Sequence, residues 1–137
     1  MEFTVPTTQL THAAVMEMLR AGIAKAEEIG QPQCIVIVDA SGETLGTVRM
    51  TGAKFLSLKS ARSKARTAAS NRAETKVIPE DFRTPIAFAT GGEVTGLPGG
   101  VPIKVGGDVV GGIGIGSGTG DQDLAVARAA LDAIGAD

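Results

Sequence analysis

A short turn of glycine, serine and threonine is the part of this sequence best suited to binding a ligand. It reads Gly-Ser-Gly-Thr-Gly at residues 116–120 and connects an expected strand, residues 108–115, to a helix expected to begin at about Asp121. The first N–H groups of a helix have no partner within the helix and attract anions. The alternative is a tight connection whose glycines serve packing alone. The candidate ligands of a small anion are therefore Gly116, Ser117 and Gly118.

His12 is the only histidine of the chain, and thus its only imidazole for binding a metal or moving a proton. It lies near the start of an expected helix, on an apolar stripe with Val15, Met16 and Leu19. Packing against the core or a neighbouring subunit explains such a residue at least as well. A metal site that needs several imidazoles is excluded, because one chain supplies only one.

Three charged residues suggest chemistry on a carboxylate. Arg49 ends an expected strand, and its planar guanidinium matches a carboxylate, although a salt bridge to an acid such as Asp39 or Glu93 explains it equally well. Glu93 and Asp121 flank the glycine-rich segment and are the candidates for a general acid or base. Solvation of Glu93 and helix capping by Asp121 are the simpler explanations. Ser117 has no identifiable histidine base, so a hydrolase triad is not indicated.

Composition argues against several other functions. Aromatic residues make up only 3% of the chain and the net charge is -2, which disfavours a nucleic-acid surface. We interpret the basic helix face of Lys59, Arg62 and Arg66 as a solvated or intersubunit surface. Cys34, as the only cysteine, can form neither an internal disulfide nor a cysteine-based zinc site. No apolar run approaches the ~20 residues of a membrane helix and no secretion signal is evident, so we expect a cytoplasmic protein with neither membrane nor nucleic-acid partners.

The elements that must position these residues follow from periodicity and turn chemistry. Apolar periodicity predicts helices at residues 8–29, 54–72 and 121–134. In the second helix, the face of Leu58, Ala61, Ala65 and Ala68 consists mostly of small residues. Apolar and β-branched runs predict strands at residues 33–39, 43–50, 86–89, 101–105 and 108–115. Gly106-Gly107 predicts a hairpin turn between the last two strands. Short hairpins favour an antiparallel sheet covered by helices, here in a single domain over residues 1–137.

Several segments occur in an order that resembles a known family. They are Val36-Ile37-Val38-Asp39-Ala40-Ser41-Gly42, Arg49-Met50-Thr51-Gly52-Ala53, Lys64-Ala65-Arg66-Thr67-Ala68-Ala69, Gly99-Gly100-Val101-Pro102-Ile103, and Val110 to Gly118. Together they resemble the GlcG/HbpS-like family, a haem-binding or haem-degrading type of domain that is also similar to the C-terminal domain of PduO-type corrinoid adenosyltransferases. Thr51 stands where the family usually has Asp, so the carboxylate beside Arg49 is lost.

The resemblance implies a profilin-like α/β fold of the α+β type, with an antiparallel five-stranded sheet flanked by helices. It also implies self-association into tetramers or octamers. Haem is the ligand it suggests first, with His12 as the axial ligand of the iron and with Arg49 and the glycine turn binding the propionates.

The alternative is a cofactor-independent lyase or isomerase acting on a small aromatic or hydroxy-acid carboxylate. In that hypothesis Arg49 and the turn amides hold the carboxylate, while Glu93, Asp121 or His12 moves the proton. A purely structural or regulatory subunit is the third hypothesis. The sequence leaves open whether the protein is an enzyme.

Overall fold

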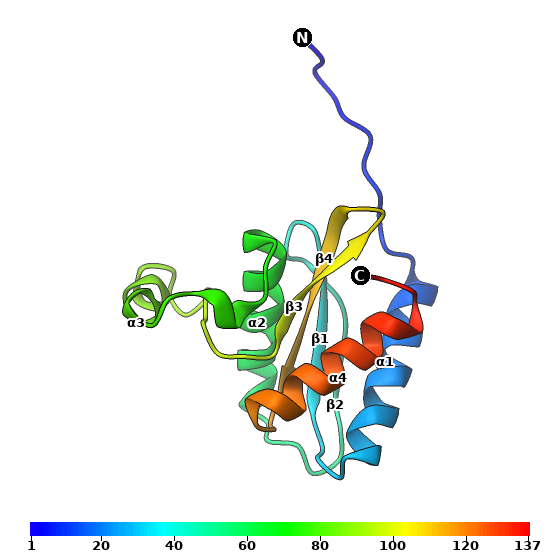
Figure 1. Cartoon of the computed structure of the whole chain (residues 1–137), viewed down its shortest axis with the longest axis vertical. Helices are drawn as coiled ribbons and strands as arrows, with labels where there is room; N and C mark the ends of the chain where they lie inside the picture. Colours follow the sequence, from blue (N-terminus) through cyan, green and yellow to red (C-terminus); the bar gives the residue numbers. More distant parts are fainter.

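The computed structural model describes all residues from 1 to 137 and contains one antiparallel sheet between two layers of helices (Figure 1). The helices and strands are α1 (His12–Glu28), β1 (Cys34–Asp39), β2 (Thr44–Arg49), α2 (Ser57–Asn71), the 3-10 helix η1 (Thr75–Val77), α3 (Glu80–Ala89), β3 (Gly100–Val105), β4 (Asp108–Gly116) and α4 (Gly120–Ala133). The strand order is β2-β1-β4-β3, and every neighbouring pair is antiparallel. No helix combines the length and apolar character needed to cross a membrane.

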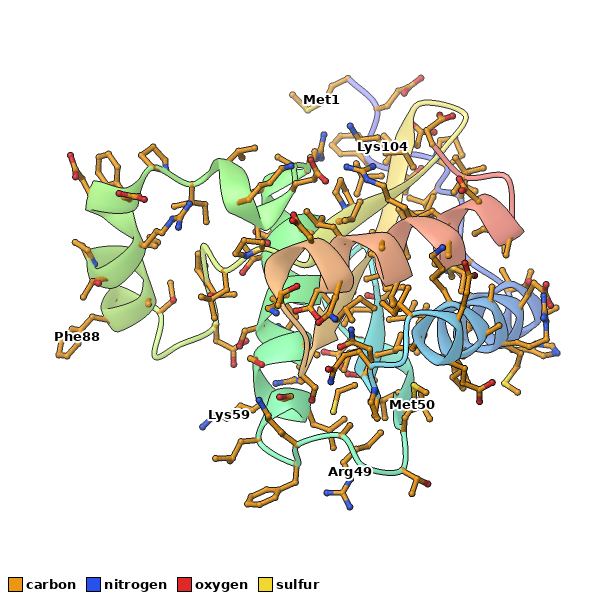
Figure 2. All side chains as sticks on the ribbon, turned by 60° about the horizontal axis from the view of Figure 1, so that its bottom comes forward. Met1, Arg49, Met50, Lys59, Phe88 and Lys104 are labelled. Atoms are coloured by element: carbon orange, nitrogen blue, oxygen red, sulfur yellow. The ribbon has the colours of Figure 1, made fainter.

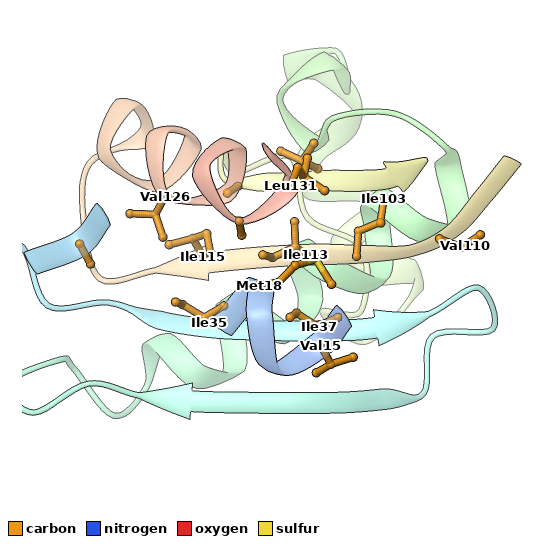
Figure 3. Close-up of a cluster of buried hydrophobic side chains, with 14 residues drawn as sticks. Val15, Met18, Ile35, Ile37, Ile103, Val110, Ile113, Ile115, Val126 and Leu131 are labelled. Atoms are coloured by element: carbon orange, nitrogen blue, oxygen red, sulfur yellow. The ribbon is translucent and has the colours of Figure 1, made fainter. Parts of the chain in front are cut away.

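Alternation along β1 divides the core into two parts. Ile35 and Ile37 face α1 and α4 and belong to the larger cluster, which also contains Met18, Ile113 and Val126 (Figure 3). The intervening residues of β1 face α2 and form a smaller cluster with alanines of that helix; this cluster contains Cys34, Val36, Val38, Ala61, Ala65 and Ala69. Successive side chains of a strand point to opposite faces, so β1 is buried on both.

Close packing of α2 on β4 explains much of the glycine density. A Cβ added at Gly114 would overlap the carbonyl oxygen of Ala61, and one added at Gly112 would overlap that of Ala65. Small residues on both elements therefore let the helix backbone approach the strand backbone. For these glycines, packing rather than ligand binding is the reason for the residue type.

The sheet has four strands, so the expectation of five was wrong. Residues 86–89, expected as a strand, form the last turn of α3. Glu80 and Asp81 occupy the first helical turn, where carboxylates are favourable. The helix continues through Pro85, because the carbonyl of exposed Asp81, left without its partner N–H, can accept from water.

The first two helices begin later than expected. Thr11 caps α1 by accepting a hydrogen bond from the Ala14 amide (3.2 Å), so the helix begins at His12 rather than at residue 8. The buried stripe consists of Val15, Met18, Gly22 and Ala26. His12 and Met16, expected on the apolar face, are exposed instead. The second helix begins at Ser57 rather than at residue 54.

Candidate functional site

Arg49, Cys34 and Gly116 form a row across one end of the sheet. Arg49 at the end of β2 pairs with Cys34 at the start of β1, and Cys34 also pairs with Gly116 at the end of β4. Neighbouring strands lie about 4.8 Å apart, which places Arg49 about 10 Å from Gly116. The structure therefore brings Arg49 to the same end of the molecule as the glycine turn, as the sequence hypothesis required.

A pocket of about 610 Å³ lies beside Arg49. Its walls come from the end of α1, the loop that follows it and the end of β2, and they include Ile23, Glu27, Pro32, Val48, Met50 and Thr51. Arg49 is exposed and takes part in none of the ion pairs of the structure; neither Asp39 nor Glu93 pairs with it. The pocket thus combines a free guanidinium with apolar walls, a suitable arrangement for a small organic carboxylate.

Cys34 is not a reactive group at this end of the sheet. Its thiol is buried, and burial raises its pKa, while a hydrogen bond with Ser117 and the charge of Arg49 act in the opposite direction. A thiol held in its protonated form is a poor nucleophile. Cys34 is therefore a packing residue of the smaller core cluster.

The glycine turn is closed by side chains of its own helix. The amide of Gly118 donates to Asp123 Oδ1 (3.1 Å), and Thr119 and Gln122 form a reciprocal capping box, with N–H to oxygen distances of 2.9 and 3.2 Å. Ser117 has a φ of 95°, and its hydroxyl accepts from the Lys54 amide (3.1 Å). These bonds use amides that a bound anion would need. The structure consequently favours a structural role for Gly116, Ser117 and Gly118.

A buried ion pair lies beneath this turn. Lys64 Nζ donates to Asp123 Oδ2 (3.0 Å) and to the Ile115 carbonyl (2.7 Å). Burial raises the pKa of Asp123, while Lys64 and the Gly118 amide lower it. The side-chain amide of Gln33 lies nearby and lowers this pKa slightly further. Neither Nε2 nor Oε1 of Gln33 makes a well-formed hydrogen bond. The cluster joins α2, α4 and the turn.

His12 lies at the opposite end of α1 from the Arg49 pocket. Glu27, which lines that pocket, is fifteen residues further along the helix, or about 22 Å at the rise of an α-helix. The His12 side chain takes part in no hydrogen bond or ion pair of the structure. Within one chain, therefore, His12 does not meet Arg49 or the glycine turn around a common ligand.

Two cations without ion-pair partners line a hollow formed in part by the segment that leads into α1. Arg72 and Lys104 line a hollow of about 500 Å³ together with Val5, Thr7 and Thr8. Thr8 precedes His12 by four residues, a span of at most about 14 Å. Figure 2 shows Lys104 at the end of the molecule opposite Arg49. Large apolar side chains are also exposed in the N-terminal segment, in α1 and in strands β2 and β3. They are Phe3, Val5, Met16, Leu45 and Val105.

Neither of the two candidate acids, Glu93 and Asp121, lines the Arg49 pocket. Glu93 pairs with Arg66 (3.0 Å) and Arg62 (3.8 Å), and it lines a hollow beside Ala40–Gly42, the turn that follows β1. That turn is about 20 Å from the Arg49 end of β1. Asp121 is exposed in the first turn of α4 and does not line the pocket. The carboxylate that does line it is Glu27.

The sequence interpretation missed Lys64 and Glu27. Lys64 lies in α2 between Ala61 and Ala68, both on the predicted small face, and a lysine on such a face needs a buried carboxylate. That position was the available signal. Nothing in the local sequence of Glu27 indicates that it lines a pocket with Arg49, because the pocket joins segments that are distant in sequence.

Comparison with known proteins defines the family. A sequence model described as "Haem degrading protein HbpS-like" matches residues 10–132, and the chain belongs to this family. The chain is 36% identical over 129 residues to an uncharacterised 15.0 kDa protein from the dhaT-dhaS intergenic region of Citrobacter freundii, covering 90% of both. It is also 36% identical over 109 residues to protein GlcG of Escherichia coli K12, covering 77% of this chain and 80% of GlcG. The predicted GlcG/HbpS-like resemblance is therefore confirmed.

Solved structures agree with this assignment. The crystal structure of a complex of PduOC with haem superimposes with a TM-score of 0.89 at 27% identity, covering 95% of this chain and 98% of that one. The crystal structure of HbpS gives a TM-score of 0.84 at 34% identity, with 95% and 93% covered. The α+β fold with an antiparallel sheet flanked by helices is thus shared.

Proposed function

We propose that this protein binds haem at the His12 end of α1, with the imidazole of His12 as the axial ligand of the iron. The observation that carries the proposal is an exposed imidazole without a hydrogen-bond partner, at the end of a segment that lines a hollow with two unpaired cations. Membership of the HbpS-like family and the similarity to a PduOC complex with haem support it.

The residues present at this end suit the chemistry of haem. Histidine is the commonest protein ligand of haem iron, and the His12 imidazole is free to serve. Arg72 and Lys104 would hold the propionates, and the exposed apolar side chains of Val5 and Met16 would cover part of the macrocycle. When bound, haem would supply redox chemistry or ligand binding at its iron. In this assignment Arg72 and Lys104, rather than Arg49 and the glycine turn as in the sequence hypothesis, bind the propionates.

Self-association is part of the proposal. An exposed His12 on the outer surface of α1 leaves one side of a haem uncovered within a single chain, so a second copy is the expected cover. The tetramer or octamer expected from the family resemblance and the cytoplasmic location both stay predictions.

A visible-absorption titration of the haem-free protein with haem tests the propionate assignment. We expect a saturable shift of the Soret band in the wild type. In the variant Arg72→Ala/Lys104→Ala, we expect affinity weaker by about tenfold, the effect of losing two exposed charge interactions. Arg49→Ala is the matched control, because it removes a cation from the other end of the molecule. Weaker binding in Arg49→Ala but not in the double variant would contradict the assignment.

The Arg49 pocket supports a second candidate function, the binding or conversion of a small aromatic or hydroxy-acid carboxylate. The observation that favours it is the unpaired guanidinium of Arg49 beside apolar walls. Of the acids considered from sequence, neither Glu93 nor Asp121 lines this pocket, so proton transfer would fall to Glu27.

Benzoate and glycolate serve as probes of this second function. Ligand-observed NMR should detect binding of one of them to the wild type and its loss in Arg49→Ala, with partial retention in Arg49→Lys, because lysine keeps the charge without the planar fork. Equal binding by the wild type and Arg49→Ala would remove the basis of this candidate.

A further inference from the structure

The helix α3 buries none of its ten residues against its own chain. It projects from the body of the molecule in Figure 1. It also contains Pro85, which removes one of its backbone hydrogen bonds. Isolated helices shorter than ~12–15 residues are marginal in water, and most helical stability in proteins comes from packing of an apolar face. A contact outside the chain is therefore expected to stabilise α3.

Both ends of the segment that carries α3 are fixed to the body. The guanidinium of Arg83 donates to the carbonyls of Ile78 (2.9 Å) and Lys76 (3.0 Å) before the helix. After it, Ser63 Oγ donates to the Gly92 carbonyl (2.9 Å) and Thr67 Oγ1 to the Glu93 carbonyl (3.2 Å). The helix is thus held in a defined position with its outer surface free. We call residues 80–89 the arm.

The exposed surface of the arm is apolar with an acidic start. The phenylalanines Phe82 and Phe88 are 64% and 90% exposed, and Ile86 lies one turn after Phe82. Single exposed apolar residues are ordinary, but several on one helix that buries no residue mark a candidate interaction site. Glu80 and Asp81 in the first turn have no ion-pair partner within the chain.

A second surface of the same chain has the complementary character. The turn before α2 and the start of that helix border a hollow of about 440 Å³, lined by Lys54, Phe55, Leu56, Ser57 and Ser60. Phe55 and Leu56 are each 68% exposed. Lys54 borders this hollow and Lys59 follows on α2, and neither forms an ion pair. We call this surface the α2 hollow. Figure 2 shows Phe88 and Lys59 on the same side of the molecule, away from α1.

From this complementarity we infer that the arm of one copy docks on the α2 hollow of a second copy, and that the second copy returns the same contact. Phe82, Ile86 and Phe88 cover Phe55 and Leu56, while Glu80 and Asp81 face Lys54 and Lys59. A two-fold dimer presents both surfaces at once, since each chain carries one of each. This contact lies away from α1, so it is a contact between copies separate from the one that the proposed function expects over His12.

The size of the contact is adequate for a specific dimer. An aromatic side chain buries about 150–250 Å² when fully covered, so covering the exposed parts of Phe55, Phe82 and Phe88 in two chains removes on the order of 900 Å² of apolar surface. Aliphatic and charged neighbours add to this. Specific interfaces bury at least about 1,000 Å² in total, which the exchange of two arms reaches.

Light scattering on the haem-free protein, combined with size-exclusion chromatography, tests the contact. We expect the wild type to be a dimer or a larger assembly. The variants Phe82→Glu/Phe88→Glu in the arm and Phe55→Glu in the α2 hollow should each reduce the mass by half or more. All three positions are exposed in the single chain, so circular dichroism should show both variants folded. The control Ala24→Glu places a charge on an exposed position of α1 and should leave the mass unchanged.

Charge reversal makes the test specific for the proposed partner surfaces. Lys54→Glu/Lys59→Glu should dissociate the assembly, and adding Glu80→Lys/Asp81→Lys should restore it. A monomeric wild type, dissociation by the arm variant but not by Phe55→Glu, or no rescue would each overturn the inference. Because haem is absent from these measurements, a failed haem titration and a failed dimer contact are distinguishable.

Discussion

Lys64 and Asp123 form a buried ion pair that joins α2 to the first turn of α4. The distance from Lys64 Nζ to Asp123 Oδ2 is 3.0 Å, and the two side chains are only 6% and 3% exposed. The other carboxylate oxygen accepts from the Gly118 amide, and the ammonium also donates to the Ile115 carbonyl. The pair therefore fixes the glycine turn to both helices, and it has structural consequences that can be measured.

Removing one member of the pair should destabilise the fold strongly. Lys64→Met leaves the Asp123 carboxylate buried without its cation, and we expect the free energy of unfolding to fall by about 3–5 kcal/mol, as for other broken buried pairs. The double variant Lys64→Met/Asp123→Leu should lose less than Lys64→Met alone, because no charge is then left unpaired. Urea denaturation of the single and double variants measures both effects. Additive losses would show that the two side chains do not interact.

Stability should depend on pH through Asp123. Burial raises the pKa of this carboxyl above its ordinary value of 3.8, so the folded protein retains a proton that the unfolded chain has already lost. The resulting stabilisation is complete below the unfolded pKa and is lost as the pH rises through the folded pKa. Relative to Asp123→Asn, the free energy of unfolding of the wild type should therefore decrease from acid pH toward neutrality. An increase would mean that the attraction of Lys64 outweighs burial.

The contact of α2 with β4 should tolerate no side chain at Gly114. Gly114→Ala places a methyl group against the Ala61 carbonyl, and the helix must move away, at an expected cost of about 3 kcal/mol. Gly91→Ala is the matched control, because Gly91 has open space around it and a φ of 62°. There we expect only the backbone strain of about 1–2 kcal/mol. Thermal unfolding followed by circular dichroism compares the two; equal losses would argue against close packing.

The capping box of α4 should be measurable by itself. Thr119→Ala removes the acceptor of the Gln122 amide and should lower the free energy of unfolding by about 1 kcal/mol. Thr119→Ser keeps the hydroxyl and should restore most of this loss. If Thr119→Ala were neutral, the turn amides would not depend on their own side chains, and an anion site there would regain support.

Much of the fold was predictable because its elements have strong local signals. The β-branched run at residues 34–38, the Gly106-Gly107 hairpin and the Ala61–Ala68 face of α2 are all confirmed. Residues 86–89 were misassigned because a short apolar run fits a strand and a helix alike. The outward direction of His12 was missed because α1 offers two overlapping apolar stripes, and only packing on β1 and α4 selects the one containing Met18.

The candidate site was predictable only in part. The nearness of Arg49 to Gly116 follows from strand pairing, and the sequence hypothesis had placed them together. The distance between His12 and Arg49 depends on the direction of α1 across the sheet, which no local pattern specifies. The pairing of Glu93 with Arg66 likewise joins segments that are distant in sequence. Tertiary arrangement, rather than residue type, decided these outcomes.

Haem binding at His12 is the central claim, and a Soret-band titration of His12→Ala tests it most directly. The matched control is Arg49→Ala, which alters the other end of the molecule and should bind haem as the wild type does. We expect His12→Ala to lose the Soret shift, and added imidazole to restore part of it by occupying the vacated axial position. An unchanged titration in His12→Ala, or a loss of binding in Arg49→Ala alone, would contradict the claim.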